Sequence, residues 1–213
     1  MRSRSRLLSA PIPSATLSIA ADRIARGSNF QLAAGWAIET FGAASWQRSL
    51  ERLGAADLRE WDGAPTPIGV YRFGALRRAM LALAHEVERP EEEIVAPLYA
   101  HIAGCQLGGA QRLVFRATSP VLIIAKIPAL WRGLFTIGSA RLEKATRDSA
   151  TMRFTVPGCL VDWLAPFTLG ATTRVVEIAG GGGATVWETD RRALGADTWD
   201  LAFTLDWRSE LHA

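Results

Sequence analysis

The chain has 213 residues, of which 49% are hydrophobic, and a net charge of +3 at neutral pH. This length is sufficient for one well-cored domain. No run of eighteen apolar residues occurs, which excludes a membrane-spanning helix. Residues 1–26 contain five arginines and one aspartate, so the rest of the chain has a charge of −1. Because the positive charge is confined to the N-terminus, the sequence indicates no nucleic-acid partner for the folded body.

Residues 1–26 predict a basic, disordered arm in front of a single domain over residues 27–213. A cleaved secretory signal is the alternative for this arm, but Pro11 and Pro13 interrupt the continuous apolar segment that such a signal needs. The two cysteines, Cys105 and Cys159, make no disulfide framework. We therefore expect packed thiols and a reducing, cytoplasmic location.

Hydrophobic residues recur at three- and four-residue intervals over residues 27–138, which predicts a succession of helices. Residues 62–69 contain two prolines and two glycines and predict an extended connector between two of them. We expect helices from a cap at Ser28 or Asn29 to Gly42, from Ser45 to Gly54, around Leu58 and Trp61, over 74–87, over 90–108, in two short pieces within 111–125, and from about 127 to Gly138.

The hydrophobic spacing changes from three or four to two at Gly138, as it does where helices give way to strands. We expect a hairpin over 139–146 and 150–156, a helix over 159–170 that Pro166 kinks or shortens, and strands at 173–179, 184–189 and 199–207. The predicted fold class is α+β: a helical N-terminal portion, 27–138, packed on a small antiparallel sheet, 139–207, that one helix crosses.

No complete catalytic or metal-binding constellation is readable. His101 and Cys105 are four residues apart on one predicted helix and could supply two metal ligands, but no second pair accompanies them, so we expect no metal site. Cys159 stands at a predicted helix N-terminus without a histidine nearby in sequence, which favours a structural thiol over a nucleophile. We predict no catalytic residues, and the chain is more typical of a binding protein than of an enzyme.

Four local sequences, in their order and spacing, resemble the haem-nitric-oxide-binding (HNOB, H-NOX) superfamily. Residues 38–46 look like its early helix, Phe-Gly turn and following tryptophan, and residues 90–95 like its Pro-x-Glu-Glu-Ile helix start. Residues 130–138 take the place of its proximal helix, and residues 174–177 that of the strand after its last helix. The resemblance covers about residues 27–207 and is closest to haem-less relatives, namely four-vinyl-reductase-type sensor domains and an uncharacterised paralogous family best known from myxobacteria.

The departures from the family pattern concern haem. The resemblance implies a histidine ligand on the proximal helix, yet no histidine occurs from 102 to 211. It also implies a Tyr-x-Ser-x-Arg clamp for the haem propionates, where residues 154–158 read Phe-Thr-Val-Pro-Gly. The Cys-x3-Gly-x3-Cys pattern of four-vinyl-reductase-type domains is matched only by its glycine, with Arg191, Gly195 and Trp199 at the three positions. The resemblance therefore implies a relative without haem or any other cofactor.

Large apolar side chains are concentrated around the change of periodicity at Gly138. They are either plain core or the wall of a partly open apolar cavity, which would measure about 300 Å³ or more. The leading hypothesis is a haem-free sensory protein that binds a small apolar molecule there. The alternative is a protein-interaction scaffold with a filled pocket, which binds a protein partner or dimerises. The candidate ligand-binding residues, here named the aromatic seam, are Leu130, Trp131, Phe135, Phe154, Trp163 and Phe167.

Overall fold

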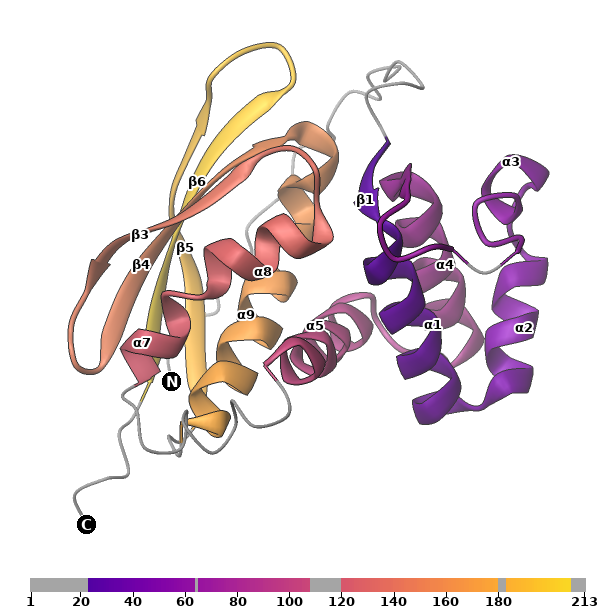
Figure 1. Ribbon diagram of the computed structural model, residues 1–213, viewed down its shortest axis with the longest axis horizontal. Helices are drawn as coiled ribbons and strands as arrows, with labels where there is room; N and C mark the ends of the chain where they lie inside the picture. The colour runs from indigo at the N-terminus through magenta and orange to yellow at the C-terminus, as the bar shows by residue number, and fades with distance from the viewer. Residues whose placement is uncertain (1–22, 64, 108–119, 180–182, 208–213) are drawn as a thin grey trace, which may run out of the picture.

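The computed structural model describes residues 23–63, 65–107, 120–179 and 183–207. Helices and a short two-stranded ribbon come first in the chain, and a four-stranded sheet with one long helix follows (Figure 1). The first set is β1 (Arg23–Arg26), α1 (Gly27–Phe41), α2 (Ala43–Glu51), α3 (Ala55–Leu58), β2 (Val70–Arg72), α4 (Phe73–Glu86), α5 (Glu92–Gln106), α7 (Pro120–Ile124) and α8 (Ile127–Leu134). The second set is β3 (Ser139–Ala145), β4 (Ser149–Pro157), a 3-10 turn (Gly158–Leu160), α9 (Val161–Ile178), β5 (Ala184–Ala193) and β6 (Thr198–Trp207). The predicted α+β class is confirmed.

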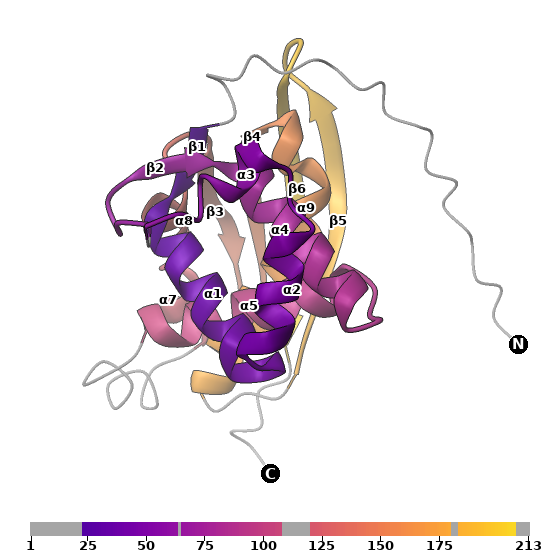
Figure 2. The same cartoon turned by 90° about the vertical axis from the view of Figure 1, so that its right-hand side faces the viewer.

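Helices α1 to α4 form one group, and α5 lies between this group and α9 (Figures 1 and 2). The spacing of Leu76, Met80 and Leu83, all fully buried, gives α4 the apolar face that the sequence predicts. Helices α5 and α9 pack without space for a further side chain, because a Cβ at Gly170 would lie 1.9 Å from the carbonyl oxygen of Ala96. This close contact joins the helical part to the sheet part.

The sheet is antiparallel with strand order β3-β4-β6-β5. Residues of β4 alternate between the two faces, and Met152 and Phe154 pair with Phe203 and Leu201 of β6 on the inner face. All four of these side chains are fully buried. Helix α9 lies along this inner face, with its buried residues directed at β5 and β6 on one side and at α5 on the other. The alternation therefore places Phe154 next to α9.

Strands β1 and β2 form a two-stranded antiparallel ribbon, which corrects the expected arm boundary at residue 26. Ile24 and Ala25 are 1% and 0% exposed, and Ala25 also makes an isolated bridge with Phe135. No local pattern indicates this strand, because its partners in β2 and at Phe135 lie far along the chain. The connector expected at 62–69 precedes β2, and the part of the arm at 1–22 lies outside the described residues.

The strand expected at 173–179 is wrong, because α9 continues to Ile178. The run Thr-Thr-Arg-Val-Val-Glu-Ile has high strand propensity, but Ala171, Val175 and Ile178 recur at helical spacing and are buried on the helix. Pro166 lies inside α9 and does not shorten it. The order after Gly138 is therefore β-β-α-β-β, and β5 extends to Ala193, four residues beyond its predicted end.

The predicted cap of α1 is also wrong. The helix begins at Gly27 without a side-chain cap, and the Ser28 hydroxyl donates instead to the carbonyl oxygen of Gly133. The helices expected over 74–87 and 90–108 are confirmed within two residues at each end, and α7 confirms part of 111–125. Residues 108–119 and 180–182 lie outside the described residues. Among the described helices, none combines the length and the apolar character needed to cross a bilayer.

Candidate functional site

Helix α8 brings three members of the aromatic seam to the start of the sheet. Leu130 and Trp131 lie on its buried face, and Phe135 follows in extended backbone at its C-terminal end. Gly138 then turns the chain into β3 with a φ of 76°. A Cβ at this glycine would lie 2.7 Å from the carbonyl oxygen of Thr155, so the turn requires a residue without a side chain.

The side chains of α8 meet Phe154 from β4 and Phe167 from α9. The Trp131 ring centroid is 4.5 Å from that of Phe135, and 5.6 Å from those of Phe154 and Phe167. Such distances are those of tilted and edge-to-face rings in direct contact. All six residues of the aromatic seam are buried, with Leu130 the most exposed at 7%. The structure therefore buries all six predicted residues and brings the rings of Trp131, Phe135, Phe154 and Phe167 into one cluster.

Three further rings belong to the cluster and are not among the residues that the sequence predicted. Phe73 lies 5.3 Å from Trp163 and 5.9 Å from Phe135, Tyr99 lies 4.6 Å from Phe167, and Phe203 lies 5.9 Å from Phe154. A signal for Tyr99 was present, because Val95, Tyr99 and Ala103 form a second apolar row on α5. Phe73 and Phe203 also had local signals, since Phe73 continues the apolar stripe of α4 and Phe203 belongs to the period-two alternation of the predicted strand at 199–207. Those patterns predict burial and do not say which rings these two side chains contact.

The polar atoms of Trp131, Trp163 and Tyr99 all have hydrogen-bond partners within the protein. The Trp163 Nε1–H donates to the Tyr99 hydroxyl at 2.9 Å, and the Asn29 side chain bonds the same hydroxyl at 3.3 Å. Trp131 Nε1–H donates to the carbonyl oxygen of Ile137 at 3.2 Å. Burial raises the pKa of Tyr99 to about 12, so this phenol is harder to ionise than that of an exposed tyrosine. The aromatic seam thus presents apolar surface and no group ready for proton transfer.

These side chains do not fit a haem bound in the manner of the family. Helix α8 contains no histidine, and the rings of Trp131, Phe135 and Phe167 contact one another. His85 and His101, the histidines of the described residues, belong to α4 and α5 and make their side-chain contacts with Arg52 and Cys105, outside the cluster.

Two other candidate features lie away from the aromatic seam. Cys105 Sγ is 3.3 Å from His101 Nε2 on an exposed part of α5, and among the described residues no group of three metal-ligating side chains occurs. An open hollow of about 490 Å³ lies at one end of the sheet, and none of its lining residues belongs to the aromatic seam. It is lined by Asp148, Ser149, Gly183, Thr185, Asp206 and Trp207.

Comparison with known proteins gives matches among solved structures alone: no family model and no curated protein matches the sequence. The Fe(II) unliganded H-NOX protein from K. algicida is 15% identical with a TM-score of 0.65, over 88% of this chain and 99% of that one. A mutant of T. tengcongensis H-NOX is 14% identical with a TM-score of 0.64, over 85% and 97%. An oxygen-binding H-NOX domain related to soluble guanylate cyclases is 14% identical with a TM-score of 0.63, over 85% and 94%. At these identities the likeness concerns the fold, and the chain has an H-NOX-like α+β fold.

Proposed function

We propose that this protein is a haem-free, non-catalytic sensory domain that binds a small apolar molecule at the aromatic seam. On this proposal it belongs to the haem-less branch of the H-NOX-like fold, beside the four-vinyl-reductase-type sensors and the paralogous family of myxobacteria. The observation that carries the proposal is Trp131. Its indole stands on α8, where the family resemblance implies a histidine, and packs against Phe135, Phe154 and Phe167.

The chemistry of the site supports an apolar ligand. The indole N–H groups of Trp131 and Trp163 and the Tyr99 hydroxyl are engaged within the protein. The polar groups of a polar ligand would find no hydrogen-bond partner among these side chains, and each unpaired group costs about 1–3 kcal/mol. In the part of the chain that the structure describes, neither cysteine forms a disulfide, which is consistent with the proposed cytoplasmic location.

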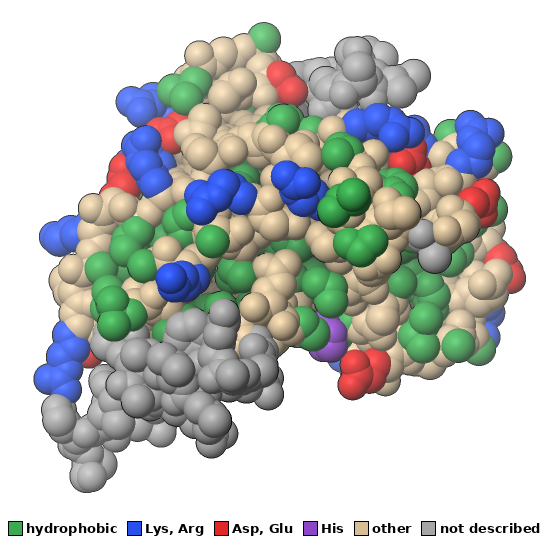
Figure 3. All heavy atoms as spheres, in the orientation of Figure 1, with side chains coloured by type: hydrophobic (Ala, Val, Ile, Leu, Met, Phe, Trp, Pro, Cys, Tyr) green, Lys and Arg blue, Asp and Glu red, His purple; other side chains and the backbone are tan. Residues whose placement is uncertain are grey.

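The contacts between the rings favour a second candidate function, a scaffold whose pocket is filled by its own side chains. Phe167 lies within 6.3 Å of Phe135 and of Phe154, so the seam rings already contact one another. A scaffold would act through its surface. The face that holds α8 and the β3–β4 hairpin exposes hydrophobic side chains among lysine and arginine side chains (Figure 3). A protein partner or a second copy of the chain is the occupant expected there.

Native mass spectrometry of the purified full chain, with an absorption spectrum of the same sample, tests these functions. A co-purified apolar mass that is released on unfolding is the result expected for the ligand-binding domain. A protein free of any added mass, but dimeric or bound to a protein partner, would favour the scaffold instead. A Soret band in the absorption spectrum would overturn the haem-free assignment.

A further inference from the structure

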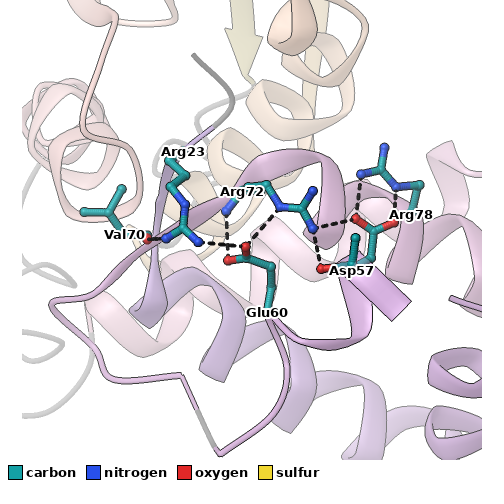
Figure 4. Close-up of polar contacts among 7 residues, drawn as sticks. Arg23, Asp57, Glu60, Val70, Arg72 and Arg78 are labelled. Carbon is teal, nitrogen blue, oxygen red and sulfur yellow. Dashed lines mark hydrogen bonds and ion pairs between the residues drawn. The ribbon is translucent and has the colours of Figure 1, made fainter. Parts of the chain in front are cut away.

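An ion-pair network fastens the β1–β2 ribbon to the helical part (Figure 4). Glu60, which is 7% exposed, accepts hydrogen bonds from Arg23 Nη2 and from Arg72 Nε, both at 3.0 Å. The backbone N–H of Arg72 donates to the same carboxylate at 3.3 Å. The Glu60 carboxylate thus binds one arginine from each strand of the ribbon, Arg23 of β1 and Arg72 of β2.

Asp57 extends the network to α4. Arg78 donates to both of its carboxylate oxygens, at 2.5 Å and 2.8 Å, and Arg72 Nη2 donates at 3.2 Å. Arg23 in addition bonds the carbonyl oxygen of Val70 across the ribbon, at 3.1 Å. Because every bond of the network has a charged donor, a charged acceptor or both, the network is stronger than the same number of neutral hydrogen bonds.

The other side of the ribbon lies against the aromatic seam. The N–H of Thr136 donates to the carbonyl oxygen of Ile24 at 2.9 Å, and Ala25 forms its bridge with Phe135. On the second strand, Arg72 is followed directly by Phe73, whose ring contacts Trp163 and Phe135. Moving the ribbon outward would therefore uncover Phe135 and Phe73, whereas the network on its outer side opposes that movement.

The β1–β2 ribbon has fewer backbone pairs than the sheet and the long helices that also cover the cluster. It has two strands of four and three residues, with an irregular register between Arg23 and Ala25. A two-stranded ribbon is marginally stable by itself. The other walls are longer, since β4 and β6 pair over nine residue pairs, and α5 and α9 are in close backbone contact at Gly170. Local opening of a fold starts at such weakly held segments.

We propose that the β1–β2 ribbon is the gate through which a small apolar molecule reaches the aromatic seam, and that Glu60 with its arginines is the latch of this gate. The inference rests on the proposed ligand-binding function and adds the route of entry and its control. Opening breaks the Ile24–Thr136 hydrogen bond and the Glu60 contacts, and leaves the sheet and the α5–α9 contact in place.

The test compares Glu60→Gln with a matched control, Glu86→Gln. Glu86 also accepts from two arginines, Arg48 at 2.6 Å and Arg52 at 2.8 Å, but it joins α2 to α4 away from the ribbon. Hydrogen exchange in the full chain reports opening at the Thr136 amide, and global unfolding at the amide of Met152 in the sheet. Stopped-flow fluorescence with the neutral probe N-phenyl-1-naphthylamine reports entry and release.

Glu60→Gln should accelerate exchange at Thr136, and entry and release of the probe, by roughly tenfold, the size expected when charge-assisted hydrogen bonds are weakened. Any acceleration at Met152 should be smaller, and Glu86→Gln should leave the Thr136 and probe rates unchanged. Unchanged Thr136 exchange in Glu60→Gln, or equal acceleration at Thr136 and Met152, would overturn the latch. Accelerated Thr136 exchange with unchanged probe rates would overturn the gate alone. If the ribbon opens faster but no variant binds the probe, the proposed ligand-binding function fails, and the gate with it.

Discussion

Replacing Trp131 by alanine tests whether the aromatic seam is packed as a unit. The indole is 1% exposed, contacts the rings of Phe135, Phe154 and Phe167, and donates to the carbonyl oxygen of Ile137. Removing a buried Trp or Phe side chain costs about 3–5 kcal/mol, through lost burial and the cavity that remains. Against a total stability of about 5–15 kcal/mol for a domain, that is a large fraction.

The assay is guanidinium unfolding followed by far-UV circular dichroism, in which the expected loss lowers the midpoint by roughly 0.5–1 M. Trp187→Ala is the matched control, because Trp187 is 44% exposed on β5, and we expect it to lose less than about 1 kcal/mol. The new cavity at Trp131 would be apolar and large enough for a benzene-sized molecule. Added indole should therefore restore part of the stability of Trp131→Ala and none in the control. A loss at Trp131 no larger than that at Trp187 would refute the packing described for the aromatic seam.

Three further predictions concern other parts of the fold. Hydrogen bonding from Arg78 lowers the pKa of Asp57 in the folded state. The ionised carboxylate therefore stabilises the fold above the unfolded-state pKa near 3.8, and this stabilisation is lost as the pH falls through the lower folded-state pKa. Asp57→Asn should remove this contribution to the acid dependence of stability, measured by urea titrations from pH 5 downwards. Tyr99→Phe should lower the free energy of unfolding by about 1–3 kcal/mol, because it leaves the Trp163 Nε1–H unpaired. In an absorbance titration it should remove the tyrosinate signal of the tyrosine whose pKa is raised to about 12. Gly170→Ala should be strongly destabilising, since its Cβ would lie 1.9 Å from the carbonyl oxygen of Ala96, whereas Gly35→Ala on α1, with no atom within 4 Å, should stabilise by roughly 0.5–1 kcal/mol in thermal unfolding.

Local periodicity was sufficient for most of the helices. The change of spacing at Gly138 correctly marks where α8 is followed by the β3–β4 hairpin, and the six residues chosen around it are all buried. Periodicity succeeds there because the faces of α4, α8 and β4 are each buried along one side. Whether those six residues bind a ligand stays a prediction.

The errors occur where distant contacts overrule local preference. The run at 172–178 has the composition of a strand, but packing of α9 between α5 and the sheet makes it helical. Ile24 and Ala25 belong to a polar, arginine-rich segment in the sequence and become a strand only because β2 and Phe135 offer backbone partners. Ser28 could cap a helix, and instead bonds the end of α8.

The order of side chains along each element was enough to predict the α+β class, the change of structure at Gly138, and the apolar character of the candidate site. Tertiary structure alone decided that Phe73, Tyr99 and Phe203 complete the cluster. It also decided that Glu60 holds the β1–β2 ribbon against the site. These contacts join residues far apart in the chain, and their partners are fixed by packing and charge in three dimensions, which no local pattern records.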